Sequence, residues 1–294
     1  MSIDGFVSYI TFEKRFSHLT VQSYQHDLSQ FALYCQSQYQ INNIAEANHS
    51  IVRSWLVSLM ELDKIKARSI NRKISTLKSY YKFLLKEGVI KTSPMAKVTA
   101  PKTEKKLPVF VEQSKMNELF DETYFKTDYE GVLSKAIIML FYATGMRRAE
   151  LLNLKESSFN FYEGTVKVLG KRNKERLIPL TAEVIVVLKQ YKEKKVTQKF
   201  ISEYFFINPK AKPVSEQNIY TIVKKYLGNL GQTGKKSPHI LRHTFATHML
   251  NNGSDLNAIK EMLGHASLAA TQVYTHNSIE KLKEAYKKAH PRGE

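Results

Sequence analysis

Residues 239–250 read HILRHTFATHML and residues 263–276 read LGHASLAATQVYTH, which places histidines and an arginine ahead of one tyrosine, Tyr274. Two shorter basic strings precede them: TGMRRAEL at residues 144–151 and LGKRNKER at residues 169–176. Cationic side chains of this kind can surround a phosphate, and a tyrosine hydroxyl can attack its phosphorus atom. The four strings together predict phosphoryl transfer to a tyrosine.

The histidines also allow a different hypothesis, a metal site. His239 and His243 are one helical turn apart, the spacing of a metal-binding pair on a helix. However, no acidic residue lies between Ser237 and Met249, and Arg242 beside the histidines would repel a cation. We therefore expect no metal and no other cofactor.

The composition sets the class of protein and of partner. The chain has 294 residues, enough for two domains, with 45 Lys and Arg against 27 Asp and Glu and a formal charge of +18. That surplus favours a polyanionic partner, nucleic acid first, over a generic basic protein. One cysteine, Cys35, excludes an internal disulfide, and neither a signal peptide nor a membrane span is apparent. We expect a cytoplasmic protein.

The first hundred residues predict helices almost throughout. One begins after a cap at Thr20, another at Ser50, and a third near Ser69, ending at Gly88. The apolar stripe of the first of these consists of Tyr24, Leu28, Phe31 and Leu33. Basic residues on the third can contact DNA or simply face solvent, and these are Arg68, Arg72, Lys73 and Lys78.

Residues 94–108 contain three prolines and several lysines without helical periodicity, which predicts an extended basic linker. The predicted organisation is thus an N-terminal helical domain at 1–93, a linker at 94–108 and a second domain at 109–294. The second domain should contain a β-hairpin, with Lys171 in its turn region. Its helices are expected at 130–144, from Thr181, near Gln217, from Ser237, and at 255–263, 268–274 and 278–289.

The four basic strings occur in the order found in the tyrosine recombinase (phage integrase) family, and nearly the whole chain resembles that family. Within the family, the chain resembles the bacterial Xer recombinases. The resemblance implies a mainly α fold with a small β-sheet. A helical, SAM-like core-binding bundle and a catalytic domain would form a clamp around DNA.

The resemblance also implies a role for each site residue. Arg147 and Arg242 would clamp the scissile phosphate, and His265 would bond one of its non-bridging oxygens. Tyr274 would attack and form a 3′-phosphotyrosine, with His239 assisting as acid and base. Lys171 would protonate the departing 5′ oxygen. Glu150 would orient active-site groups or be an ordinary carboxylate at a helix start, and His243 would be structural. Arg148 departs from the family, because close relatives usually have an apolar or small residue there, and it would add a phosphate contact or face solvent.

The family works as a homo- or hetero-tetramer on double-stranded DNA that carries a specific recombination site. The segment from Ser278 resembles a tail that packs into a neighbouring subunit. The implied function is resolution of chromosome dimers for segregation at cell division, with a DNA translocase of the division apparatus as a further partner. The alternatives are a minimal mobile-element integrase of the same chemistry, a DNA-binding protein without catalysis, and a type IB topoisomerase.

Overall fold

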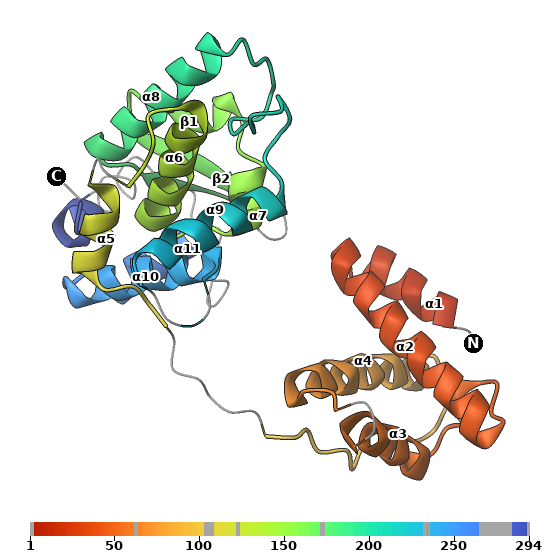
Figure 1. Cartoon of the computed structure of the whole chain (residues 1–294). Coiled ribbons are helices and arrows are strands. Elements are labelled where there is room, and N and C mark those ends of the chain that lie inside the picture. The colour runs from red at the N-terminus through yellow and green to blue at the C-terminus, as the bar shows by residue number, and fades with distance from the viewer. Residues whose placement is uncertain are drawn as a thin grey trace. The chain divides into compact units, whose positions relative to one another are not determined.

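The computed structural model consists of two compact units, Met1–Lys106 and Leu107–Glu294, each with its own hydrophobic core (Figure 1). It describes residues 3–61, 64–102, 109–121, 124–170, 174–231, 234, 236–264 and 284–292. Within these ranges, no helix is both long enough and apolar enough to span a bilayer.

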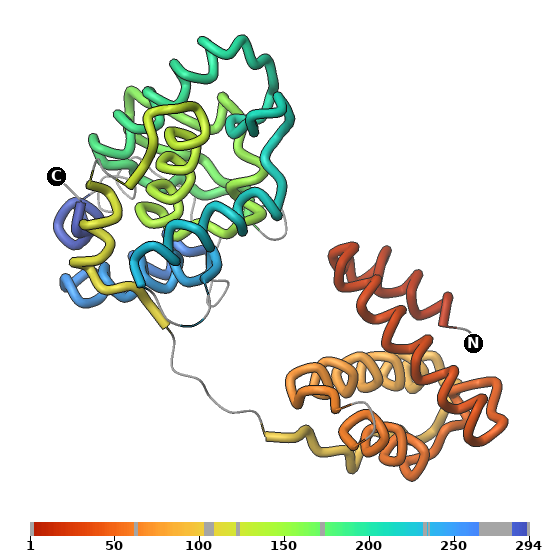
Figure 2. Tube along the Cα trace, viewed as in Figure 1, coloured from red at the N-terminus to blue at the C-terminus, as the bar shows by residue number. Residues whose placement is uncertain are grey.

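The N-terminal unit is a bundle of helices, drawn in red to orange in Figure 2. Its elements are α1 (Ile3–Ser8), η1 (Tyr9–Glu13), α2 (His18–Tyr39), η2 (Ile44–Glu46), α3 (His49–Glu61) and α4 (Ala67–Lys86). Helix α2 contacts α1, α3 and α4, so the longest helix of the unit joins the others into one core.

Helix α2 differs from the sequence prediction at two points. Its cap is Ser17, whose Oγ accepts a hydrogen bond from the backbone N–H of Thr20, so that Thr20 is already inside the helix. Phe31 is fully buried, whereas Leu33 is 65% exposed. Two residues correspond to about 200° around an α-helix, so Leu33 lies on the side opposite Phe31.

The second unit consists mainly of helices and contains one small sheet. Its helices are α5 (Gln113–Phe120), α6 (Tyr129–Thr144), α7 (Arg148–Leu152), η3 (Glu156–Ser158), α8 (Ala182–Thr197), α9 (Glu216–Asn229), α10 (Pro238–Asn251) and α11 (Leu256–Leu263). Strands β1 (Phe159–Asn160), β2 (Thr165–Leu169) and β3 (Glu175–Pro179) form an antiparallel sheet in the order β1-β2-β3. The predicted fold class, mainly α with a small sheet, is confirmed.

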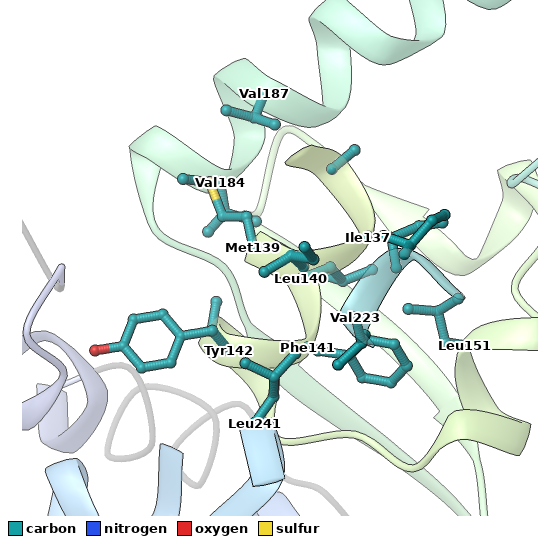
Figure 3. Packing of buried hydrophobic residues seen from close by; sticks show 14 of the residues in the cluster. Ile137, Met139, Leu140, Phe141, Tyr142, Leu151, Val184, Val187, Val223 and Leu241 are labelled. Carbon is teal, nitrogen blue, oxygen red and sulfur yellow. The ribbon is translucent and has the colours of Figure 1, made fainter. Parts of the chain in front are cut away.

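Helix α6 is the centre of this unit and is apolar on almost every face. It packs against α8, α9 and α10, and Figure 3 shows Val184, Val223 and Leu241 of these three helices around it. The helix ends at Gly145, which has a φ of +57°. A Cβ there would lie 2.4 Å from the ring of Phe245, so only glycine fits.

Residues 284–289 are helical and pack against the same unit of the same chain. Tyr286 is 2% exposed, and its hydroxyl donates a 2.7 Å hydrogen bond to the carbonyl of Ala143. Asn252 donates a 2.9 Å hydrogen bond to the carbonyl of Ala289. These contacts lie within one chain, and packing of the tail into a neighbouring subunit stays a prediction. The expected helix at 268–274 lies outside the described residues.

Candidate active site

Arg242 projects from α10 and joins the ends of two other helices. Its Nη1 donates to the carbonyl of Gly145 at 2.6 Å, and its Nη2 donates to the carbonyl of Leu263 at 2.7 Å. These carbonyls belong to the C-terminal ends of α6 and α11, which lack partners within their helices and carry partial negative charge. A buried guanidinium therefore fixes both helix ends and is itself oriented by them.

Arg147 lies just before α7, where both its backbone N–H and its guanidinium donate to the carboxylate of Glu150. Its backbone N–H donates to Glu150 Oε2 at 2.7 Å, and its Nη1 donates to Glu150 Oε1 at 2.9 Å. Its Nη2 donates to the carbonyl of Gly264 at 3.0 Å. The side chain is 29% exposed, so the guanidinium is held in place and remains accessible to a ligand.

The carboxylate of Glu150 binds a second arginine, Arg176, which the sequence analysis did not identify as a site residue. Arg176 donates two hydrogen bonds to the Glu150 carboxylate, at 2.9 and 2.8 Å, and its Nε donates to the carbonyl of Met262 at 2.6 Å. Burial alone would raise the pKa of Glu150. The bonds and charge of Arg176, and then the bonds from Arg147, outweigh burial and lower that pKa below its ordinary value.

We call Arg147, Glu150, Arg176 and Arg242 the arginine cluster. It holds three cationic side chains and one carboxylate, so two positive charges are not neutralised within it. Burial, and then the charge of Arg147, lower the pKa of Arg242 to about 10, which leaves this group protonated at neutral pH. Such a cluster can bind a dianionic group.

His239 lies in the first turn of α10 and is exposed. Partial burial lowers its pKa, and the proximity of the His243 ring and of the guanidiniums of Arg148, Arg242 and Arg147 lowers it further. The imidazole is therefore neutral at pH 7 and can accept a proton. His243 is exposed as well, which does not fit the structural role expected for it. His248, by contrast, is buried, and its Nδ1 lies 3.0 Å from the hydroxyl of Tyr142.

Lys171, His265 and Tyr274 lie outside the described residues. The described residues that precede the first two, Gly170 and Gly264, both adjoin Arg176. A Cβ on Gly264 would lie 3.0 Å from Arg176 Nη1, and one on Gly170 would lie 3.5 Å from the same atom. Both glycines thus border the arginine cluster.

Arg148 carries no separate contact to the cluster. Its guanidinium forms a 2.7 Å ion pair with Glu216, and 40% of its side chain is exposed. Across the described part of the chain, no group of three or more His, Cys, Asp or Glu residues is arranged to hold a metal ion.

In the N-terminal unit, the four basic residues expected to contact DNA occupy different environments. Arg68 and Lys78 are exposed, and Arg72 is exposed while paired with Asp27. Lys73 is 3% exposed and donates a 2.9 Å hydrogen bond to Asp27, so it belongs to the core. We therefore leave Lys73 out of any DNA-contacting set.

Two family profiles match the chain. That of the phage integrase family matches residues 110–281, and that of the phage integrase N-terminal SAM-like domain matches residues 3–88. The chain is similar to tyrosine recombinase XerC of Oceanobacillus iheyensis, with 39% identity over 99% of this chain and 96% of the relative. It is also similar to tyrosine recombinase XerD of Staphylococcus haemolyticus, with 37% identity over 99% and 98%.

Among solved structures, the fold resembles that of the XerH site-specific recombinase bound to palindromic difH substrate in a post-cleavage complex. The TM-score is 0.69 at 24% identity, and the match covers 91% of this chain and 79% of the other. The likeness concerns the fold.

Proposed function

The chain belongs to the phage integrase family of tyrosine recombinases, among its Xer members, and from that premise we propose that it resolves chromosome dimers by site-specific recombination. The reaction cuts and rejoins DNA strands through a 3′-phosphotyrosine. The observation that carries the proposal is the arginine cluster, which has a surplus of two positive charges and one partly exposed guanidinium, that of Arg147.

The chemistry asks for charge and positioning. Attack on a phosphodiester gives a pentavalent transition state with additional negative charge on its non-bridging oxygens. Arg147 and Arg242 would clamp these oxygens, and a hydrogen bond from His265 would add to them. Helix-end carbonyls orient both guanidiniums before substrate binds, so little reorganisation is needed at the moment of reaction.

Each proton has an assigned route. The Tyr274 oxygen bonds to phosphorus while its proton passes to His239, whose lowered pKa keeps it neutral. The bond from phosphorus to the 5′ oxygen breaks, and Lys171 protonates that oxygen. The phosphotyrosine keeps the energy of the broken phosphodiester, so the reverse attack by a 5′ hydroxyl reseals a strand without ATP. Glu150 acts on Arg147 and not on the substrate.

The partners follow from the reaction. We assign the DNA contacts of the N-terminal unit to Arg68, Arg72 and Lys78, which are exposed on α4. Pairwise strand exchange needs four active sites, and hence a tetramer of this chain alone or with a second recombinase. A cytoplasmic location and a DNA translocase of the division apparatus belong to the same proposal.

A covalent-trapping assay tests the proposal. A duplex that carries the host's dimer-resolution sequence and a nick next to the scissile phosphate releases a short fragment on cleavage, which leaves the protein attached. Tyr274→Phe should bind this duplex and give no adduct. Tyr286→Phe is the matched control, because Tyr286 is fully buried against Ala143 and cannot reach a phosphate. An adduct in the Tyr274 variant, or none in the native protein, contradicts the proposal.

A further inference from the structure

We infer that Arg176 is a positioning residue for strand cleavage. It keeps the carboxylate of Glu150 from neutralising Arg147, and it joins β3 to the end of α11. The inference rests on the proposed function, because it concerns the same phosphate clamp.

The contacts of Arg176 exclude a direct role at the phosphate. Its side chain is 5% exposed, and all three nitrogens of its guanidinium donate hydrogen bonds within the protein. Three of its donors are directed into the protein, two to Glu150 and one to the carbonyl of Met262. A buried cation with these contacts can act only on the groups that it holds.

The first of these groups is Glu150. Its two oxygens each accept from both Arg147 and Arg176, at 2.7 to 2.9 Å. One carboxylate shared by two guanidiniums leaves one positive charge on the trio. Without Arg176, the carboxylate would pair with Arg147 alone and leave no net charge on the pair. The net positive charge of the arginine cluster would then fall from two to one. That charge is needed at the phosphate, where the transition state gains negative charge.

The second group is the end of α11. Three consecutive carbonyls, those of Met262, Leu263 and Gly264, accept hydrogen bonds from Arg176, Arg242 and Arg147, at 2.6, 2.7 and 3.0 Å. Each of the three arginines thus holds one peptide of the same turn. Arg176 is the member that connects this turn to the sheet, since it belongs to β3.

Two glycines border this guanidinium, and Gly264 leaves room for it. Gly264 has a φ of +62°, and a Cβ there would be 3.0 Å from Arg176 Nη1 and 3.2 Å from its Cζ. At Gly170 a Cβ would be 3.5 Å from Nη1 and 3.6 Å from Glu150 Oε1. The chain therefore approaches Arg176 closely from both sides, from the strand pair and from α11.

The test compares Arg176→Met, which removes the charge at similar length, with a matched control in the same unit. The control is Lys195→Met. Lys195 is also 5% exposed at its side chain and bonds a carboxylate, Glu156, together with the carbonyls of Tyr204 and Phe205. Both variants lose one buried cation and its carboxylate bond, so both should melt at lower temperature. Only Arg176→Met removes a contact of the arginine cluster.

Cleavage is measured on two nicked duplexes, one with the natural scissile phosphate and one with a methylphosphonate in its place. The methyl group removes the negative charge of one non-bridging oxygen, and with it most of the need for cationic stabilisation. We expect Arg176→Met to cleave the phosphodiester about 10- to 100-fold more slowly, by analogy with the loss caused by removing a group that orients a metal-ligating side chain. Its deficit on the methylphosphonate should be much smaller. Arg176→Lys keeps the charge without the paired bonds and should fall between native and Arg176→Met. Lys195→Met should cleave both duplexes at the native rates.

If Arg176 were merely structural, Arg176→Met and Lys195→Met would lose activity equally, and on both duplexes. That result would overturn the inference. If Arg176→Met does not melt cooperatively, Arg176→Lys carries the test, and an unchanged ratio of its two rates is then the contrary outcome. A crystal structure of the variant provides a readout without cleavage. Arg147 should keep its contacts to Glu150 in that structure, while the turn at residues 262–264 moves away from β3 because the bond to the Met262 carbonyl is lost. A turn that stays in place would overturn the inference that Arg176 joins β3 to α11. No adduct from the native protein on either duplex contradicts the proposed function instead.

Discussion

Replacement of Asp27 by alanine should destabilise the N-terminal unit strongly. Asp27 is fully buried between α2 and α4, where it accepts hydrogen bonds from Lys73 at 2.9 Å and from Thr76 at 3.0 Å, and pairs with Arg72. Without the carboxylate, the ammonium of Lys73 stays buried with Gln30 as its remaining partner. Arg72, with a side chain 43% exposed, can turn to solvent.

The magnitude follows from these burials. Removal of one partner of a buried ion pair costs about 3–5 kcal/mol, because the other charge remains desolvated. The contribution of Arg72 is small, since exposed pairs are worth about 0–1 kcal/mol. With a urea m-value of about 1.5 kcal/mol per M, a loss of about 4 kcal/mol lowers the unfolding midpoint by roughly 2–3 M.

The chain contains its own reporter for this transition. Trp55 is the single tryptophan, is 2% exposed, and has the Lys73 ammonium 5.6 Å from its ring centroid. Its fluorescence in the full-length protein therefore follows unfolding of the N-terminal unit alone. Glu150→Gln is the control, because it alters the other unit and should leave the Trp55 transition in place.

A second variant separates the charge from the packing. Asp27→Leu combined with Lys73→Met removes both members of the pair, and the double variant should unfold at higher urea than Asp27→Leu alone. A midpoint shift below about 0.5 M for Asp27→Ala, or a double variant less stable than the single one, would refute the reasoning.

Four further outcomes are expected for the reaction. Lys171→Ala should cleave ordinary DNA slowly and recover much of its rate on a 5′-bridging phosphorothiolate, whose sulfur leaves without a proton; equal impairment on both substrates would assign Lys171 to clamping. Cleavage should persist in excess chelator, because fixed cations replace a metal, and a requirement for a divalent ion at the chemical step would contradict the mechanism. Since the pKa of His239 lies below 6.5, the cleavage rate should hold at neutral pH and fall as the pH drops through that lowered value, and His239→Gln should lose this acid limb; a midpoint above 6.5 contradicts the assignment. Loss of Arg68 and Lys78 should reduce the magnitude of the slope of log affinity against log salt by about 0.9 per phosphate contact, and an unchanged slope would make α4 a solvated face.

The sequence was sufficient for the class of fold and for the elements that carry the site. Long apolar periods predicted α6, and turn residues between two β-rich runs predicted the hairpin of β2 and β3, because both signals are local. Boundaries were less accurate where caps were ambiguous, as at Ser17, since several polar residues in a row can accept the first free N–H of a helix.

Side-chain environments were harder to predict than elements. Lys73 and Lys78 look alike in the sequence, yet one is buried against Asp27 and the other is exposed, because the partner comes from α2, more than forty residues away. Arg176 did leave a signal. Arg176 and Ile178 are two residues apart on β3, so they lie on the same face of the strand, and both are buried. A charged residue on an inward face indicates a buried partner. The carboxylate that Arg176 contacts is determined by tertiary packing, so the sequence near Arg176 does not identify it.

The three carbonyls at the end of α11 have a consequence for genetics. The acceptors that hold Arg176, Arg242 and Arg147 are backbone atoms, which every amino acid supplies. A scan of side-chain replacements at residues 262–264 would report two buried apolar positions and one glycine, and would not reveal their shared role as anchors. That role becomes visible through backbone chemistry, for example by an ester in place of the peptide bond after Leu263, which weakens the Leu263 carbonyl as an acceptor and leaves its side chain intact. Conservation of side chains would thus understate how much of this site is made of main chain.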